Sequence, residues 1–358
     1  MCLKKLGAAL LSWIFVRCSM MPVIVAFPMK FLVIGLGSMG RRRIRCLQRL
    51  GFKDVIGFDP KESRRIEARE KHGIVTADDW ALVRSTPVDA WIISTPPDTH
   101  VAYGLEATER NTAFFAEAGV PDPQTGELIA RLKKSGVTGA PSCTMRYYPG
   151  PRRIKQLVAG AAVGRPLAFT YQVGQYLPDW HPWESYKEFY VSKRATGACR
   201  EIVPFELAWL IDIFGPVGRL SCLKGRVSDL DADIDDVYQI LLRFERNLIG
   251  HLMVDVVARP AVRVFRLVGT VGTLEWDHAS GRLRVYDAQS KSWNEENFDF
   301  GTVEPGYIHA DEPYVAELAD FIAAVRGEKP WPFSFDEDER ILDLLVRAEN
   351  SDHSGRHC

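Results

Sequence analysis

FLVIGLGSMGRRRI, residues 31–44, decides the fold of this chain. The apolar run 31–35 predicts a short buried strand, and the apolar side chains at 44, 47 and 50 recur at the spacing of one helix face. A turn with glycines at 35, 37 and 40 lies between them. A strand, a turn of the form GxGxxG and a helix, in this order, form the phosphate-binding unit of a dinucleotide-binding fold.

Each glycine of this turn has a separate role. Gly35 permits the tight turn, Gly37 lets a pyrophosphate approach the backbone, and Gly40 lets the helix pack close to the strand. Ser38 and Met39 complete the loop and are predicted to contact the cofactor. Asp59 ends the next predicted strand, 55–59, where its carboxylate can accept hydrogen bonds from ribose hydroxyls. The pattern therefore predicts NAD, with NADP less favoured.

Three arginines follow the glycines, at positions 41, 42 and 43. Cations in a first helical turn oppose the helix dipole by about 0.3–1 kcal/mol each. A bound anion would offset this repulsion, and the alternative is that the three side chains extend into water.

The organisation of the chain follows outward from this unit. Strand-like and helix-like segments alternate over residues 31–142, which predicts βαβ units on a parallel sheet. Long stretches of period-two alternation dominate after Tyr147, at 167–177, 236–245, 248–257, 263–277 and 282–287. These predict a mostly antiparallel, open-faced sheet, with a helix near 204–214. Helices around 312–326 and 336–349 close the chain. The fold class is thus α/β, a Rossmann doubly wound domain followed by an α+β domain.

Length indicates the number of domains, and composition argues against nucleic acid and metal as partners. The 358 residues fit about two domains, which we place at 29–145 for the dinucleotide-binding domain and 146–350 for the substrate and oligomerisation domain. Residues 351–358 form a frayed tail. The net charge of −1 and the lack of a dense basic block argue against nucleic acid. Seven cysteines without a CxxC pair indicate neither a metal site nor a redox pair.

Residues 1–28 are predicted to be an extension outside the fold, and a start codon assigned too early would account for them. The run Leu6–Val16 imitates a secretory signal, which is the alternative interpretation. It is too short to span a bilayer, so no membrane contact is expected. A cofactor domain directly downstream argues against export, and we expect a cytoplasmic protein.

Three further motifs support a family resemblance. Residues 94–100 read STPPDTH, residues 113–121 read AFFAEAGVP, and residues 312–330 read EPYVAELADFIAAVRGEKP. With GLGSMG, they make the chain resemble the Gfo/Idh/MocA oxidoreductases over about residues 30–350. The resemblance implies that the nicotinamide half of the cofactor is lined by Thr95, Pro96, Pro97 and His100. It implies that Glu117 lies near the nicotinamide ribose, and that subunits pair through the outer face of the second sheet into a homodimer or homotetramer.

The chain departs from that family at two positions. The family usually reads Glu-Lys-Pro where this chain reads Glu117-Ala118-Gly119, so the lysine that helps to move the substrate proton is absent. The family's aspartate in the second domain corresponds to Glu201, and its histidine corresponds to Phe205. Glu206 is the nearest ionisable neighbour and a candidate substrate contact. Another group must therefore act as the base, or the protein does not catalyse.

The stretch 175–201 is where we look for that base. Six of the fifteen residues from Tyr176 to Tyr190 are aromatic, which suits stacking on sugar rings or, alternatively, a subunit contact. Trp183 and Tyr190 are the predicted substrate contacts among them. The groups in this stretch that can exchange a proton are His181, Tyr190, Lys193 and Glu201. Arg146 and Tyr147, after the last parallel strand, bind a phosphate or carboxylate in one interpretation and brace the domain junction in the other.

These observations leave two hypotheses of different class. The first is an NAD-dependent oxidoreductase acting on a secondary alcohol of a sugar, nucleotide sugar or polyol, with Glu201, Lys193 or His181 handling the proton. In one version of this hypothesis the cofactor is retained between turnovers, and in the other it is released. The second is a non-catalytic NAD-binding sensor or partner subunit, which the missing lysine and histidine favour.

Overall fold

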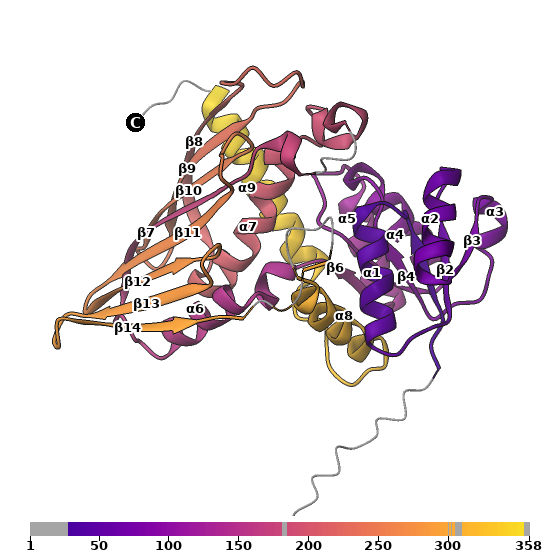
Figure 1. The fold of residues 1–358 in the computed structure, drawn as a ribbon, viewed down its shortest axis with the longest axis horizontal. Coiled ribbons are helices and arrows are strands. Elements are labelled where there is room, and N and C mark those ends of the chain that lie inside the picture. The colour runs from indigo at the N-terminus through magenta and orange to yellow at the C-terminus, as the bar shows by residue number, and fades with distance from the viewer. Residues whose placement is uncertain (1–27, 181–184, 300, 302, 305–309, 354–358) are drawn as a thin grey trace, which may run out of the picture.

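The computed structural model describes residues 28–180, 185–299, 301, 303–304 and 310–353. These residues form two β-sheets with helices packed between them (Figure 1). The predicted tail from 354 onward and the predicted extension, apart from Pro28, lie outside the described residues.

The first sheet has six parallel strands in the order β3-β2-β1-β4-β5-β6. Its strands are β1 (Phe31–Ile34), β2 (Val55–Phe58), β3 (Val75–Ala77), β4 (Ala90–Ile93), β5 (Ala113–Ala116) and β6 (Gly139–Pro141). The helices between them are α1 (Ser38–Arg49), α2 (Glu62–His72), α3 (Trp80–Val83), α4 (His100–Glu109) and α5 (Thr125–Ser135). All four residues of β1 and of β4 are buried, as expected for central strands covered on both faces.

The second sheet has eight strands in the order β14-β13-β12-β11-β7-β10-β9-β8. They are β7 (Pro166–Gly174), β8 (Val217–Gly225), β9 (Val237–Phe244), β10 (Ile249–Asp255), β11 (Val262–Gly269), β12 (Gly272–Asp277), β13 (Arg282–Asp287) and β14 (Ser292–Asn297). Neighbours are antiparallel except β7 and β10, which run parallel. The predicted fold class, a Rossmann sheet followed by a mostly antiparallel sheet, is confirmed.

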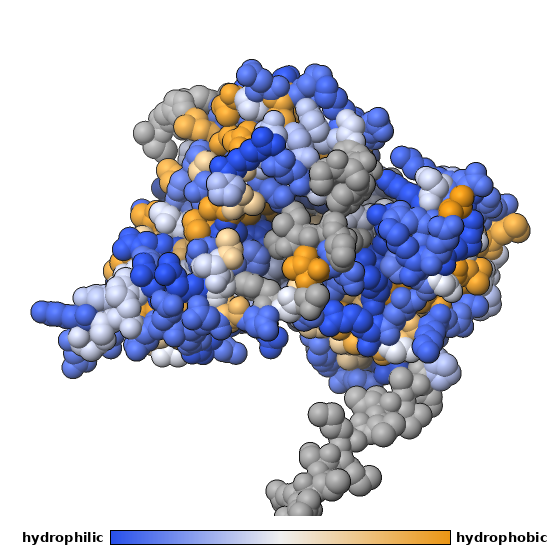
Figure 2. Space-filling view, in the orientation of Figure 1, coloured by the Kyte–Doolittle hydropathy of each residue, from blue (hydrophilic) through white to orange (hydrophobic). Residues whose placement is uncertain are grey.

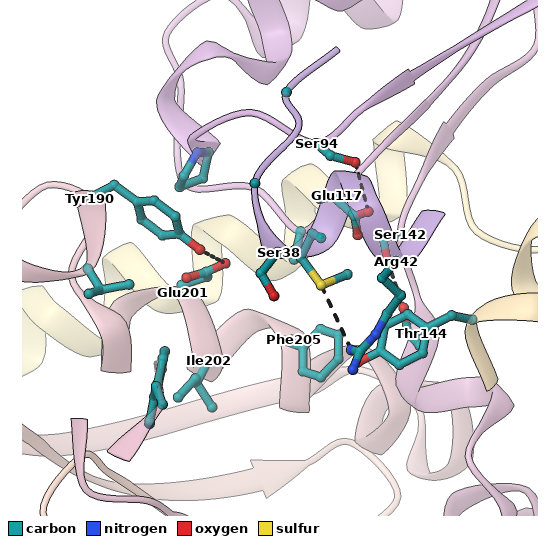
Figure 3. A pocket seen from close by; sticks show the side chains of 18 of the residues that line it. Ser38, Arg42, Ser94, Glu117, Ser142, Thr144, Tyr190, Glu201, Ile202 and Phe205 are labelled. Carbon is teal, nitrogen blue, oxygen red and sulfur yellow. Dashed lines mark hydrogen bonds between the residues drawn. The ribbon is translucent and has the colours of Figure 1, made fainter. Parts of the chain in front are cut away.

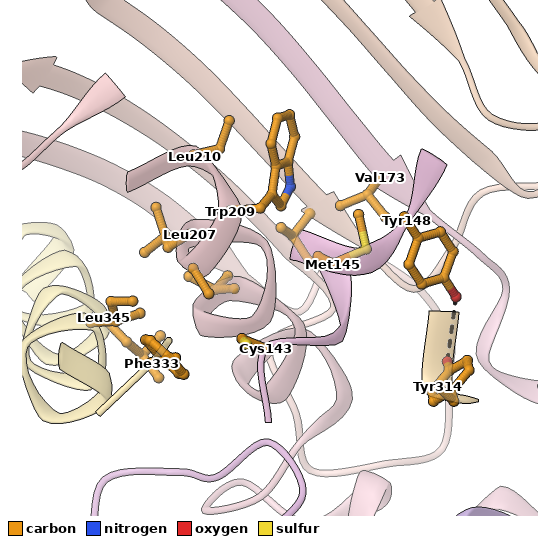
Figure 4. Packing of buried hydrophobic residues seen from close by; sticks show 14 of the residues in the cluster. Cys143, Met145, Tyr148, Val173, Leu207, Trp209, Leu210, Tyr314, Phe333 and Leu345 are labelled. Carbon is orange, nitrogen blue, oxygen red and sulfur yellow. Dashed lines mark hydrogen bonds between the residues drawn. The ribbon is translucent and has the colours of Figure 1, made fainter. Parts of the chain in front are cut away.

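Four helices join the two sheets into one body: α6 (Pro149–Ala159), α7 (Ala198–Phe214), α8 (Glu312–Val325) and α9 (Phe335–His353). Helix α7 packs against α9 and the second sheet, whereas α8 returns from that sheet to pack on α1 of the first. One hydrophobic core therefore runs without interruption from Phe31 in β1 to Leu252 in β10. Figure 4 shows its middle, where Cys143 and Met145 pack beside Trp209 of α7.

The other face of the second sheet carries no helix in the described part of the chain (Figure 1). Apolar side chains interrupt the mostly hydrophilic surface along this side of the molecule (Figure 2). Leu223, Leu241 and Ile249 are about half exposed, and their strands β8, β9 and β10 are neighbours. Among the described helices, none is both long and apolar enough to cross a membrane.

The structure differs from the predicted elements at several places. The stretch 263–277 forms a hairpin of two strands, β11 and β12, and the short helix α3 was not predicted. Helix α7 begins at Ala198, six residues before the predicted start at 204, and Pro204 lies inside it. Strands β8 and β14 were not predicted. Strand β14 reads SWNEEN and is largely exposed at the sheet edge, so its sequence lacks the apolar alternation that indicates a strand.

Candidate active site

The two sheets enclose a cavity of about 1200 Å³. Its wall includes the glycine turn, the segments after β4 and β5, and the first turn of α7. Figure 3 shows side chains from these elements around it: Tyr190 and Glu201 on one side in this view, Ser94 and Glu117 on the other, and Ser38 between.

The glycine turn leaves room where a dinucleotide needs it. A Cβ on Gly40 would lie 1.8 Å from the carbonyl oxygen of Gly35, so the close approach of helix and strand requires glycine. Gly35 has φ +89°, which also favours glycine. At Gly37, in contrast, the nearest atom to an added Cβ is 3.6 Å away, on Arg64. The helix begins after Gly37 without a side-chain cap, so amides of its first turn are available to an anion.

Asp59 lies at the adenosine side of the predicted cofactor path. It is buried and accepts hydrogen bonds from the backbone N–H of Leu36 (2.9 Å) and of Lys61 (2.8 Å). Arg64 lies 3.5 Å from the same carboxylate. Since a carboxylate has about four acceptor positions, Asp59 can still accept hydrogen bonds from a ribose. These residues fit a dinucleotide, which this chain would hold by the α1 amides and Asp59.

The segment after β4 forms another part of the wall. Thr95, Pro96 and Pro97 all line the cavity, together with His100 at the start of α4. The His100 ring nitrogen Nε2 lies 2.9 Å from the carbonyl oxygen of Thr95. Burial lowers the pKa of His100, so its imidazole is neutral at pH 7.

Glu117 has an ionisable partner that its sequence neighbourhood does not reveal. The guanidinium of Arg43 donates two hydrogen bonds to it, of 2.6 and 2.8 Å, and Ser94 donates a third of 3.3 Å. Its side chain is 13% exposed and lines the cavity. The place of the family's lysine is taken by Ala118, which also lines the cavity.

The two predicted roles of the three arginines, anion binding and extension into water, are wrong for Arg43. It is fully buried and pairs with Glu117 and Glu317. Arg42 is buried beside Asp311, 3.1 Å away, although it does border the cavity. Arg41 pairs with Glu67 at 2.7 Å. Protein carboxylates therefore offset the unfavourable helix dipole here.

Glu201 is an ionisable group in the cavity wall. It lies in the first turn of α7 and lines the cavity. Burial raises the pKa of Glu201 to about 7, and the negative charge of Glu117 adds to this. The hydroxyl of Tyr190, in the short helix Tyr190–Ser192, donates a 3.1 Å hydrogen bond to the Glu201 carboxylate and opposes the shift.

Of the other predicted residues, some line the cavity, some lie outside the described residues, and two lie away from the cavity. Lys193 and Tyr147 line the cavity, and the Tyr147 hydroxyl donates to Asp320 at 3.0 Å. Lys193 makes no ion pair with any described residue. His181 and Trp183 lie outside the described residues.

Arg146 and Glu206 do not line the cavity, so their predicted substrate contacts find no support. Arg146 hydrogen-bonds the backbone carbonyls of Ala208 and Pro332 and lies over the Phe333 ring, which matches the alternative role of bracing the junction. Glu206 is fully buried, where it accepts hydrogen bonds from Tyr171, Trp209 and Arg263.

Sequence reasoning missed Arg263 as a wall residue. It lines the cavity and lies on β11 with Phe265 and Leu267, the buried side chains of that strand. The sequence did contain a signal for Arg263, because it lies two residues before Phe265 and four before Leu267 and so shares their face of the strand. A charge on the inner face of a sheet needs a partner or a ligand.

Models of known protein families match both halves of the chain. The model of an oxidoreductase family with an NAD-binding Rossmann fold, Gfo/Idh/MocA, matches residues 29–138, and the model of the Gfo/Idh/MocA C-terminal domain matches residues 152–275. The chain belongs to the Gfo/Idh/MocA family. Its two matches fall on the two sheets described above.

Individual proteins resemble this chain more distantly. The uncharacterized oxidoreductase YrbE of Bacillus subtilis is 27% identical over 37% of the chain, and inositol 2-dehydrogenase 2 of Paenarthrobacter aurescens is 27% identical over 39%. These matches span 41% and 45% of the two relatives' own lengths. A solved structure of levoglucosan dehydrogenase with NADH and levoglucosan is 16% identical, with a TM-score of 0.78 over 92% of this chain and 98% of that one. At this identity the likeness establishes the fold alone.

Proposed function

We propose that this protein is an NAD-dependent oxidoreductase that oxidises a secondary alcohol of a sugar or polyol, with Glu201 as the proton acceptor. The observation that carries the proposal is the Glu201 carboxyl, which lines the cavity with a pKa of about 7. A general base is most effective when its pKa lies near the working pH. Glu201 can therefore act as the general base in place of the missing lysine and histidine.

Each element of the wall has a part in this reaction. The α1 amides would hold the pyrophosphate and Asp59 the adenosine ribose, and Glu117 would face the nicotinamide ribose. The bound nicotinamide supplies the hydride acceptor. Glu201 takes the hydroxyl proton as the hydride leaves, and Tyr190 keeps the carboxylate oriented through its hydrogen bond.

A sugar or polyol is supported by the aromatic wall. Trp180, Phe189 and Tyr190 line the cavity and offer faces on which a sugar ring can stack. The inositol and levoglucosan dehydrogenases named above act on compounds of this class according to their names. Asp59 supports NAD over NADP, because its charge would repel a 2′-phosphate, although Arg64 lies beside it.

The proposal also includes a cytoplasmic location and assembly into a homo-oligomer. Four of the cysteines, Cys46, Cys143, Cys199 and Cys222, are free and buried, which suits the reducing cytoplasm. The uncovered outer face of the second sheet supports a homodimer or homotetramer.

The decisive experiment compares Glu201→Gln with Lys193→Met in assays of NAD reduction with a panel of polyols and sugars. We expect Glu201→Gln to slow hydride transfer by about 10²–10⁴ while NAD affinity stays unchanged. Lys193→Met should change the rate less than tenfold. If Glu201→Gln retains more than a tenth of the wild-type rate, Glu201 is not the base.

The second hypothesis, a sensor that binds NAD without catalysis, is favoured by one specific observation. Phe205 lines the cavity where the family carries a histidine, and Ala118 does so where it carries a lysine. This hypothesis predicts tight NAD binding by calorimetry and no transfer of deuterium from any C-deuterated polyol to the nicotinamide. Such deuterium transfer without net NADH release would instead indicate a retained cofactor.

A further inference from the structure

Arg263 is a largely buried cation in the cavity wall, at the start of β11. Its side chain is 12% exposed, and the residue lines the cavity described above. Its Nη2 donates a 2.7 Å hydrogen bond to the fully buried Glu206 of α7. Its Nη1 meets only the thioether of Met145, at 3.5 Å, and its buried Nε has no acceptor among the described residues. A single oxygen atom of the described chain therefore meets the donors of this guanidinium.

Glu206 does not account for the remaining donors of Arg263. It also accepts hydrogen bonds from the Tyr171 hydroxyl (2.6 Å) and from Nε1 of Trp209 (3.0 Å). All three nitrogens of arginine carry N–H donors, and a buried donor without an acceptor is unfavourable. The guanidinium can therefore accept a further oxygen ligand from the cavity side.

Arg43 offers a comparison within the same chain. It is fully buried and does not line the cavity. Its Nε and Nη2 both donate to the carboxylate of Glu117, and its Nη2 also lies 2.9 Å from Glu317. This bracing arginine directs two nitrogens at carboxylate oxygens, whereas Arg263 directs one and borders the cavity.

Two tyrosines and a neutral histidine border the cavity beside Arg263. The Tyr148 ring centroid lies 5.9 Å from the guanidinium carbon, and the Tyr148 hydroxyl lies 3.4 Å from that of Tyr314 (Figure 4). The backbone N–H of His278 donates to the carbonyl oxygen of Arg263 at 3.0 Å, and its ring lies 5.6 Å from the Tyr148 ring. Burial lowers the pKa of His278 to about 4, and Arg263 adds to this, so its imidazole is neutral at pH 7. All four residues line the cavity.

A second cation stands at the same end of the cavity. Arg152 lies in the first turn of α6, where its backbone N–H donates to the carbonyl oxygen of Tyr148 at 3.0 Å. Its side chain is exposed, lines the cavity and makes no ion pair with any described residue. An anion bound at Arg263 would therefore also be attracted by the positive charge of Arg152.

Resting on the function proposed above, we propose that the alcohol oxidised by this protein carries a carboxylate, and that Arg263 binds this carboxylate. The substrates are thus sugar acids rather than neutral sugars or polyols. Charge-assisted hydrogen bonds from a guanidinium are well suited to a carboxylate. The carboxylate itself is unchanged by the reaction, because the hydride passes to the nicotinamide and the hydroxyl proton passes to Glu201.

The spacing along α7 suits such a substrate. Glu201 and Glu206 lie five positions apart on this helix, which is about 7.5 Å along its axis. Phe205, one turn after Glu201, lines the cavity between them. Because Arg263 is bonded to Glu206, its guanidinium lies about one and a half turns from the proposed base. A six-carbon sugar acid is long enough to place a hydroxyl at Glu201 and its carboxylate at Arg263.

The first test compares matched pairs of ligands on the wild-type protein. The pairs are D-gluconate with D-glucitol, D-glucuronate with D-glucose, and D-galacturonate with D-galactose, and D-glucose 6-phosphate represents phosphate esters. Calorimetry measures binding to the NADH-loaded protein, and reduction of NAD measures kcat/KM. We expect at least one acid to exceed its neutral partner by about tenfold or more in both measurements, because hydrogen bonds to a charged group contribute an effect of this size.

The second test removes the guanidinium. Arg263→Met combined with Glu206→Gln leaves no buried carboxylate unpaired, and it should bring the ratio of acid to neutral affinity to within about threefold of one. Arg266→Met is the matched control, because Arg266 lies on the same strand with its side chain 57% exposed and paired with Glu275. It should keep the wild-type ratio. If the double variant does not fold, Arg263→Lys carries the test, because an ammonium lacks the planar donors, and the ratio should fall at least about threefold.

Several outcomes overturn the proposal. They are equal binding of each acid and its neutral partner, no binding of any acid, tighter binding of the phosphate ester than of the acids, or an unchanged preference in the Arg263 variants. A failure of the proposed function is distinguishable, because the wild-type protein would then reduce no NAD with any compound, while calorimetry would still report whether acids bind through Arg263. Oxidation of neutral polyols without any preference for acids would leave the proposed function intact and refute the sugar-acid specificity.

Discussion

At the scale of single residues, the proposed chemistry depends on a carboxyl group with a pKa near neutrality. Burial raises the pKa of Glu201 to about 7, and the Tyr190 hydroxyl lowers it somewhat by donating to the charged form. Because oxidation requires the carboxylate, the rate should rise as pH rises through about 7 and then level off. The reverse reduction should show the opposite dependence.

Tyr190→Phe provides a directional check of this assignment. The substitution removes the hydrogen bond that favours the carboxylate, so the pKa of Glu201 should rise and the rate profile should move to higher pH. The measurement is the pH profile of kcat/KM for polyol oxidation. A profile that stays in place, or moves to lower pH, would show that another group sets it.

The glycine turn allows a second prediction, which separates binding from folding. Gly37→Ala places a Cβ at ordinary contact distance from Arg64, and the φ of Gly37, −69°, suits any residue. We therefore expect the free energy of unfolding to change by no more than about 1 kcal/mol. Gly37→Ala should nevertheless weaken NAD binding at least tenfold, because the added methyl group blocks the pyrophosphate.

Gly40→Ala is the contrasting variant. Its Cβ would meet the Gly35 carbonyl oxygen and lower the free energy of unfolding by about 1–3 kcal/mol or more. Calorimetric titration and urea unfolding report the two effects, and equal NAD affinity in Gly37→Ala and wild type would contradict the site.

Local patterns predicted the glycines and Asp59, whereas the segment from Thr95 to His100 and the position of Glu201 were implied by the family resemblance. All of these residues except Gly40 line the cavity. The pairing of Arg43 with Glu117 was beyond reach, because 74 positions separate the two residues along the chain. Only the packing of α1 against the end of β5 brings them together.

At the scale of elements, α8 is attached to the first sheet through Glu317. Glu317→Ala would leave Arg43 with a single carboxylate, and the hydroxyls of Ser142 and Thr144 with only each other as partners. Breaking a buried ion pair costs about 3–5 kcal/mol, and we expect a loss of this size in urea unfolding.

Glu312→Ala is the matched control on the same helix. Glu312 pairs with Arg49, and both side chains are nearly half exposed (45% and 47%), so its removal should cost less than about 1 kcal/mol. Similar losses for the two variants would show that the buried group contributes no more than a surface pair.

Helix α7 shows why element boundaries escaped prediction. Proline is common in the first turn of a helix, so Pro204 favoured a start near 204. The helix instead begins after Gly197, and the proline removes only one backbone donor from its interior. The added turns carry Glu201, the proposed base.

At the scale of the whole molecule, the bare face of the second sheet predicts assembly. Leu241 on β9 and Ile249 on β10 lie on that face, about half exposed. We expect Leu241→Glu to convert a dimer or tetramer into smaller species, because it would bury a charge at the subunit contact. Light scattering after gel filtration measures the mass.

Val75→Glu serves as the control for this experiment. Val75 is 69% exposed, but it lies on β3 at the edge of the first sheet. Its substitution should leave the mass unchanged. A wild-type protein that runs as a monomer at micromolar concentration would rule out the assembly.

The return of α8 to the first sheet has a consequence for protein engineering. A gene fragment that stops at residue 145 would omit Asp311 and Glu317, which pair with Arg42 and Arg43, and would uncover Phe115, which packs against Phe321 and Trp331. Chimeras that graft the nucleotide-binding half onto a foreign partner should therefore carry residues 311–333 as a second insert. Shuffling at a single crossover point near 145 would yield insoluble products.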